Sequence, residues 1–156
     1  MNKSEYIEFE LIDNEKFKDL LKVYNIIANL KSKQENESDN FWLNTFPNYS
    51  LKYYSFTNKD LKPEFETAEF NDENWHFFSM TTHLVEDIEI ELLECVDMEN
   101  GKGRLNFNAY SYPYGGTDGL TTFLNSFGFK ATEIDDGGDI YTAKWISNTK
   151  YKLKEK

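Results

Sequence analysis

The pattern of apolar and polar residues near the N-terminus predicts a β-strand. Residues 6–12 alternate between the two types, so Ile7, Phe9 and Leu11 point to one side and mostly polar residues to the other. A period of two is typical of a strand with one face against a core. We therefore expect a half-buried strand here.

A helical period follows this strand. Asp13 or Asn14 can accept a hydrogen bond from the first free backbone N–H groups and so begin the helix. The pattern extends to about Lys31, and the polar residues 33–40 then predict an exposed loop. The apolar stripe of the helix consists of Phe17, Leu20, Leu21, Tyr24, Ile27 and Ala28.

The next part of the chain is rich in aromatic residues. We expect Phe41, Trp42 and Phe46 to hold the segment after the polar loop against the core. Residues 51–57 predict a strand. Residues 58–74 contain a proline and many acids, which predicts a loop or a short edge strand.

Three further runs, residues 75–84, 88–98 and 104–112, predict a meander of antiparallel strands. The sequence Asn100-Gly101-Lys102-Gly103 marks the turn between the second and third strands. The inward residues of the second strand are predicted to be Ile88, Ile90, Leu92, Val96 and Met98. Those of the third are predicted to be Leu105, Phe107 and Ala109.

The apolar faces of these two strands also predict their register. They coincide if Met98 lies opposite Leu105 and Val96 lies opposite Phe107. A shift of one residue would place the two sets on opposite sides of the sheet.

A corner rich in proline and glycine, residues 111–119, leads into a short amphipathic helix. We expect Thr117 to cap this helix and Gly128 to end it in a left-handed conformation, with Phe129 packed back on Leu124. Its apolar stripe is Leu120, Phe123, Leu124 and Phe127. The corner could instead bind an anion, but its spacing does not match a phosphate-binding loop and Asp118 already occupies the first turn.

The chain ends with a predicted hairpin, formed by residues 131–135 and 139–146 around the turn 136–138. The element order β-α-β-β-β-β-α-β-β predicts a single α+β domain over residues 1–147, with a mainly antiparallel sheet and two helices on one face. Residues 148–156 are lysine-rich and predict a flexible tail.

Composition narrows the class of protein. Hydrophobic residues make up 39% of the 156 residues and aromatic residues 17%, which predicts a packed core. No apolar run is long enough to cross a membrane, and the N-terminus does not resemble a signal peptide. The single cysteine, Cys95, cannot form an internal disulfide. We expect a cytoplasmic protein without a cofactor.

The net charge of −11 is concentrated in one part of the chain. Residues 63–101 contain twelve acids and no lysine or arginine, whereas the rest of the chain holds 17 basic and 16 acidic residues. Nucleic acid is an unfavourable partner for such a protein, because phosphate binding needs neutralising cations.

This acidic stretch allows two interpretations. It can be a solvated face that keeps the protein soluble and discourages edge pairing. It can also be a docking surface for a basic protein, since concentrated charge speeds and selects encounters. The predicted partner-binding residues are Glu86, Asp87, Glu89, Glu91, Asp97 and Glu99.

One pair of residues in the predicted meander suggests acid–base chemistry. Glu94 interrupts the apolar face of its strand, and the predicted pairing places His76 diagonal to it. A buried carboxylate beside an imidazole can act as an acid–base pair, or it can be a structural hydrogen bond. His76 and Glu94 are therefore weak catalytic candidates.

Metal binding has less support. Asp135, Asp136 and Asp139 surround two glycines, but their spacing does not match a calcium-binding loop. Cys95 has no neighbouring histidine or second cysteine and is more typical of a small core residue. We predict no metal site.

Three functional hypotheses follow. The first is a small acidic binding protein, of the inhibitor or immunity type, that engages a basic protein partner through an acidic sheet surface. The second is an enzyme or small-molecule-binding domain with a pocket between sheet and helices. The third is a domain whose charge serves only solubility. The oligomeric state is left open.

Overall fold

The computed structural model describes residues 4–71, 73–109 and 116–156. The elements in chain order are β1 (Glu5–Glu10), α1 (Asn14–Lys33), α2 (Asp39–Thr45), α3 (Asn48–Leu51), α4 (Phe77–Thr82), the π-helical turn η1 (His83–Asp87), β2 (Ile90–Asp97), β3 (Lys102–Ala109), α5 (Gly116–Ser126), β4 (Ala131–Asp135), β5 (Ile140–Trp145) and β6 (Tyr151–Glu155).

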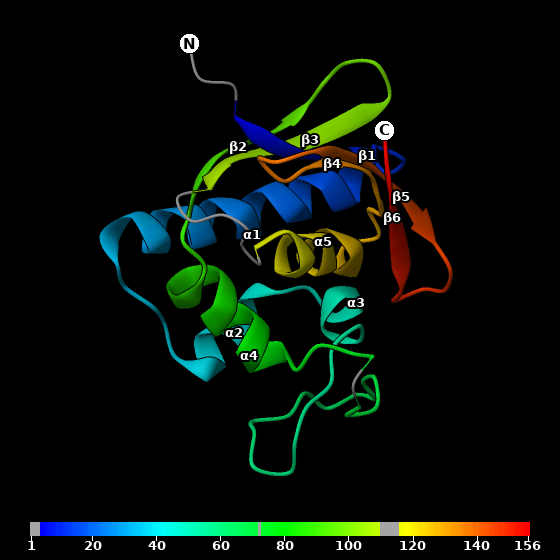
Figure 1. Cartoon of the computed structure of the whole chain (residues 1–156). Helices are drawn as coiled ribbons and strands as arrows, with labels where there is room; N and C mark the ends of the chain where they lie inside the picture. The colour runs from blue at the N-terminus through cyan, green and yellow to red at the C-terminus, as the bar shows by residue number, and fades with distance from the viewer. Residues whose placement is uncertain (1–3, 72, 110–115) are drawn as a thin grey trace.

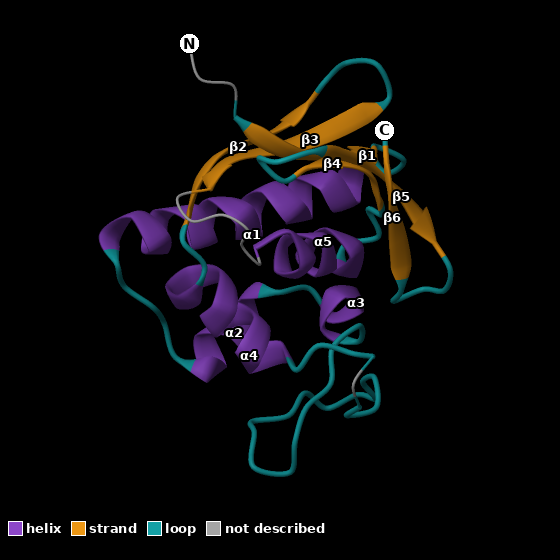
Figure 2. Ribbon diagram, in the orientation of Figure 1, coloured by secondary structure: helices purple, strands orange, loops and turns teal. Residues whose placement is uncertain are grey.

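These six strands form one antiparallel sheet in the order β2-β3-β1-β4-β5-β6, so β2 and β6 are its edges. The helices α1 and α5 lie under one face of the sheet, and the shorter helices lie beyond them (Figures 1 and 2). The predicted class is therefore confirmed: the chain is a single α+β domain with an antiparallel sheet. The short helices α2, α3 and α4 were not predicted.

Helix α1 begins where its cap was predicted. The Asp13 carboxylate accepts a hydrogen bond from the Lys16 backbone N–H at 3.0 Å, so Asp13 rather than Asn14 is the cap. The helix ends at Lys33, two residues later than expected, and Gln34 follows in a left-handed conformation. Its buried residues are Phe17, Leu20, Val23, Tyr24, Ile27 and Leu30. Leu21 and Ala28 of the predicted stripe are only partly buried against the core, and Val23 and Leu30 were not predicted.

Helix α5 confirms the predicted stripe and stop but not the predicted cap. Leu120, Phe123, Leu124 and Phe127 are all buried. Gly128 has a φ of 91°, and the Phe129 N–H donates to the Leu124 C=O at 3.1 Å, which is the expected Schellman geometry. The helix begins at Gly116, so Thr117 lies inside it and is not its cap. Residues 111–115 of the corner lie outside the described residues.

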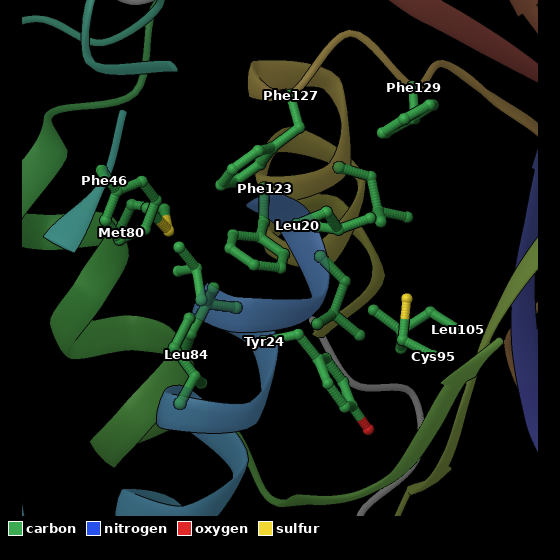
Figure 3. Packing of buried hydrophobic residues seen from close by; sticks show 14 of the residues in the cluster. Leu20, Tyr24, Phe46, Met80, Leu84, Cys95, Leu105, Phe123, Phe127 and Phe129 are labelled. Atoms are coloured by element: carbon green, nitrogen blue, oxygen red, sulfur yellow. The ribbon is translucent and has the colours of Figure 1, made fainter. Parts of the chain in front are cut away.

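Aromatic rings join the two layers of helices. Figure 3 shows Phe123 and Phe127 projecting from α5 toward Phe46 and Met80. Phe46 lies 5.0 Å from the ring of Phe77 and 5.8 Å from that of Phe127, measured between centroids. Phe46 therefore connects the segment after α2 to α4 and α5, as its predicted role in holding that segment required.

Two predicted strands are helical or irregular instead. Residues 51–57 contain the end of α3 and an irregular segment, and residues 75–84 form α4 and the start of η1. Phe77, Met80, Thr81 and Leu84 are buried at helical spacing, which fits one face of a helix better than alternate positions of a strand. The aromatic content of both segments favours strands only when a neighbouring strand is available for pairing.

The predicted register between β2 and β3 is wrong for two reasons. The turn closes Met98 on Lys102, which places Cys95 rather than Met98 opposite Leu105, and β2 contains a bulge. Leu92 pairs with Phe107 and Glu94 with Asn106, so Leu93 is an extra residue between them. Beyond the bulge the two faces of β2 exchange, which turns Cys95 into the core opposite Leu105. Cys95 is therefore the small core residue that was predicted.

The C-terminal segment is not a separate tail. Residues 151–155 form β6 and pair with β5 along their whole length, with Trp145 opposite Tyr151. The rings of these two residues lie 4.9 Å apart. The lysines that suggested a flexible tail are instead the exposed side chains of an edge strand, where lysine is common.

Candidate functional site

The structure gathers the predicted partner-binding acids along the edge strand β2 and the segments that flank it. Glu86 and Asp87 lie on η1, Glu91 and Asp97 on β2, and Glu99 in the turn to β3. All of these side chains are exposed, as is that of Glu89. Because β2 is the first strand of the sheet, these acids line one margin of the molecule (Figure 1).

Glu94 belongs with these acids and not with His76. The prediction placed Glu94 on the inward face, but the bulge at Leu93 turns it outward, where it accepts a hydrogen bond from the Asn106 amide at 3.0 Å. Glu91 accepts one from the Asn108 amide at 3.3 Å. We call the resulting set the acidic edge: Glu86, Asp87, Glu89, Glu91, Glu94, Asp97 and Glu99.

Neutral amides position several of these carboxylates. Glu86 accepts a hydrogen bond from the side-chain amide of Asn36 at 2.6 Å, and the amide oxygen of Asn36 accepts one from the Trp42 indole at 3.0 Å. Trp42 is buried, so this chain of bonds ties Glu86 to the core. The asparagines orient the carboxylates without neutralising them, which preserves the negative charge of the edge.

A groove runs beside the acidic edge, between the C-terminal half of α1 and the start of β2. It consists of two adjoining cavities of about 510 and 320 Å³. Lys31 and Ile90 line both cavities. Val85 and Ile88 add apolar surface to the larger cavity, and Ala28 and Leu92 add it to the smaller.

Lys31 spans the middle of this groove. Its ammonium donates to the Ile88 C=O at 2.8 Å, which fixes the end of α1 against the residue that precedes β2. Burial lowers the pKa of Lys31, and the nearby charge of Asp87 partly opposes this effect. The role of Lys31 could not be recognised from the sequence, because its partner is a backbone group 57 positions away.

His76 has a different environment from the one predicted. It precedes α4, and its Nδ1 accepts a hydrogen bond from the Ser79 backbone N–H at 3.3 Å, so the imidazole caps that helix. Its Nε2 donates to the Asp60 carboxylate at 2.6 Å. The hydroxyl of Ser79 lies 2.7 Å from Nδ1. The predicted pair of His76 with Glu94 is therefore wrong, because β2 pairs with β3 and residues 75–84 are not a strand.

Asp60 completes this network. It also accepts a hydrogen bond from the Thr57 backbone N–H at 2.6 Å. Burial by itself raises the pKa of Asp60, but the hydrogen bonds from Thr57 and His76 outweigh it and hold the pKa below its usual value. Asp60 and Ser79 were not predicted as partners of His76, although the helical spacing of His76 and Ser79 was a usable signal.

The aspartates of the last hairpin stabilise its turn. Asp136 accepts hydrogen bonds from the backbone N–H groups of Gly138 and Asp139 at 2.9 and 3.0 Å, and Asp135 accepts one from Gly137 at 3.0 Å. Within residues 4–71, 73–109 and 116–156 there is no group of three or more His, Cys, Asp or Glu side chains arranged to hold a metal ion.

No family model matches the chain, and comparisons with curated proteins and with solved structures return no match. Among the described residues, no helix is both long and apolar enough to cross a membrane.

Proposed function

We propose that this chain is a binding protein that engages a basic protein partner through the acidic edge. The observation that carries the proposal is the placement of the charge. Residues 63–101, the longest stretch of the sequence without lysine or arginine, supply the edge strand β2 and its flanks. An inhibitor or immunity-type protein that neutralises a basic toxin or enzyme would have this distribution of charge.

The amide contacts of Glu86, Glu91 and Glu94 support this proposal. Carboxylates that serve only solubility need no defined orientation, whereas a docking surface benefits from side chains that are ordered before the partner arrives. Concentrated charge of one sign also accelerates association with a partner of opposite sign, and salt weakens this effect.

Affinity capture with charge-reversed variants tests the proposal. The Glu89→Lys/Glu91→Lys variant should lose a basic protein that the wild type captures at low salt. The matched control is Glu64→Lys/Glu66→Lys, which changes the net charge equally at two exposed positions of the loop 58–74, far from β2 (Figure 1). The control should capture the same protein as the wild type.

Direct titration with the captured protein completes the test. Its affinity should fall steeply as salt increases, because the contacts are mainly between exposed charges. The proposal would be contradicted if both variants still capture the partner, or if the affinity for the partner does not change with salt. Loss of capture by both variants to the same extent would indicate a general effect of net charge, as the solubility hypothesis expects.

A hydrolase that uses Ser79 is the second candidate function. The observation in its favour is the hydrogen-bonded series Asp60–His76–Ser79, which has the composition of a catalytic triad. Against it, Nδ1 of His76 already accepts the Ser79 backbone N–H, and none of the three cavities described for this chain includes His76 or Ser79.

A fluorophosphonate reagent, which labels activated serines, separates the two functions. We expect no labelling that depends on Ser79, and equal signals from the wild type and from Ser79→Ala. Labelling of the wild type that disappears in both Ser79→Ala and His76→Ala would favour the hydrolase.

A further inference from the structure

We propose that the partner is bound as an added β-strand: an extended segment with alternating basic and apolar residues pairs with the outer edge of β2. This inference rests on the proposed function and specifies the form of the partner. It follows from three separate features of the same place: an edge strand, a groove along it and the charge at its rim.

The first feature is the unpaired side of β2. Within the described part of the chain, β2 pairs with β3 and with no other strand. Alternate residues of an edge strand point their backbone N–H and C=O groups away from the sheet, where they can bind another extended chain. Strand addition of this kind gives affinity through the backbone and specificity through side-chain pockets.

The second feature is the groove between β2 and α1. Its two cavities follow the strand from Ile88 to Leu92 and meet at Lys31. Side chains on one face of an added strand repeat about every 7 Å, so two successive side chains of that face can enter the two adjoining cavities. Because Ile88, Ile90, Leu92 and Ala28 line the groove, the side chains that enter it should be apolar.

The third feature is the charge on the rim. Glu86, Glu89 and Glu91 line the same two cavities. The side chains of an added strand that do not enter the groove point to its other face, on the side of the sheet where Glu91 and Glu94 meet Asn108 and Asn106. Lysine or arginine at alternate positions of the partner would therefore face these carboxylates.

The bulge in β2 limits the length of the pairing. The backbone N–H of Ile88 already donates to the His83 C=O, and its C=O accepts from Lys31, so a regular ladder can begin at Ile90. The extra residue Leu93 interrupts it after Leu92. The paired segment therefore covers the first three residues of β2, or roughly 10 Å of extended chain.

The chain itself contains a segment of the required type. In β6 the exposed residues Lys152 and Lys154 alternate with Tyr151 and Leu153, at the opposite edge of the same sheet. A second copy of this chain could thus occupy the edge of β2. We favour a separate partner, because two copies that each carry a net charge of −11 repel one another.

Backbone-methylated peptides test strand addition. The probe is the capped peptide Lys-Val-Lys-Val-Lys-Val-Lys, made in three forms: unmethylated, methylated on the valine amides, and methylated on the amides of the inner lysines. In an added strand, the amides of only one of these two sets face β2. One methylated form should therefore bind at least about tenfold more weakly than the parent, and the other within about twofold of it.

Some results with these peptides would overturn strand addition. An equal effect of the two methylated forms, or no binding of the parent peptide, overturns strand addition. A third outcome is that the parent peptide binds, that Glu89→Lys/Glu91→Lys weakens its binding, and that methylation leaves its binding unchanged. The acidic edge is then a docking surface without backbone pairing. In that case the proposed function stands and this inference fails. If the capture experiment under the proposed function gives one of its contradicting results, the proposed function itself fails.

Sedimentation of the protein alone addresses the second copy. We expect a monomer at low salt. An oligomer that disappears in both Lys152→Glu/Lys154→Glu and Glu89→Lys/Glu91→Lys, and that forms again when these two variants are mixed, would show that a second copy occupies β2. That result would overturn the assignment to a separate partner.

Discussion

Phe9 and Gly103 are cross-strand partners in β1 and β3, and the ring of Phe9 occupies the space that a side chain at position 103 would need. A Cβ atom on Gly103 would lie 2.3 Å from Cε2 of Phe9. Phe9 is itself fully buried and lies 5.3 Å from the ring of Phe129. The glycine is therefore required for the close approach of β3 to the core, and not for a turn.

Gly103→Ala should lower the free energy of unfolding by about 1–3 kcal/mol, because Phe9 must move within a packed core. Urea denaturation measures this change. Phe9→Leu removes the ring atoms that would clash, so the loss caused by Gly103→Ala should be smaller in the Phe9→Leu background. Fully additive losses would show that the ring of Phe9 is not the obstacle.

Ser126→Ala should destabilise the protein by about 1–3 kcal/mol, because it leaves two buried hydroxyl groups without their partner. Ser50 and Tyr54 both donate to the Ser126 hydroxyl, at 2.8 and 3.0 Å, and all three residues are buried. The combined variant Ser50→Ala/Tyr54→Phe/Ser126→Ala should lose less stability than the sum of its single changes. If the combined variant loses as much stability as the three single variants together, or more, the three residues do not act as one network.

Removal of β6 should destabilise the whole domain. A chain that ends at Thr149 loses the contact between Trp145 and Tyr151 and the ion pair between Lys156 and Glu133. We expect a loss of at least about 2 kcal/mol in thermal or urea unfolding, since Tyr151 is partly buried. A chain that lacks only Lys156 is the control and should lose less than about 1 kcal/mol. Equal stability of both shortened chains and the full chain would mean that this segment is a dispensable tail.

His83 should make stability depend on pH in the mildly acidic range. Its Nε2 is buried without a hydrogen-bond partner among the described residues, and the ring lies against Gly119. Burial lowers the pKa of His83; Lys31 lowers it further, whereas Asp87 and Asp118 partly oppose the shift. As the pH falls through about 6.5, the unfolded chain therefore takes up the proton before the folded one, and the free energy of unfolding decreases.

Urea denaturation between pH 5 and 7.5 measures this effect. The slope contributed by one histidine stays below about 1.4 kcal/mol per pH unit, and it ends where the folded state also binds the proton. His83→Leu should have a smaller slope in this range, whatever its stability at pH 7.5. Identical slopes for the variant and the wild type would assign the pH dependence to other groups.

The sequence by itself determined the elements whose signals are local. The start of α1 at Asp13 or Asn14, the buried stripe of α5 and the stop at Gly128 each depend on residues within a few positions of one another. The hydrogen bonds and contacts concerned form inside a single element. They could therefore be predicted without knowledge of the sheet.

Tertiary structure decided the features that depend on distant partners. The aromatic residues of segment 75–84 suit a strand or a helix, and the helix is the form in which Phe77 packs against the distant rings of Phe46 and Tyr54. The bulge at Leu93 transfers Glu94 from the predicted inner face to the acidic edge. The acids of β2 were visible in the sequence, but their position at the margin of the sheet was not, because strand order is set by pairing between segments far apart in the chain.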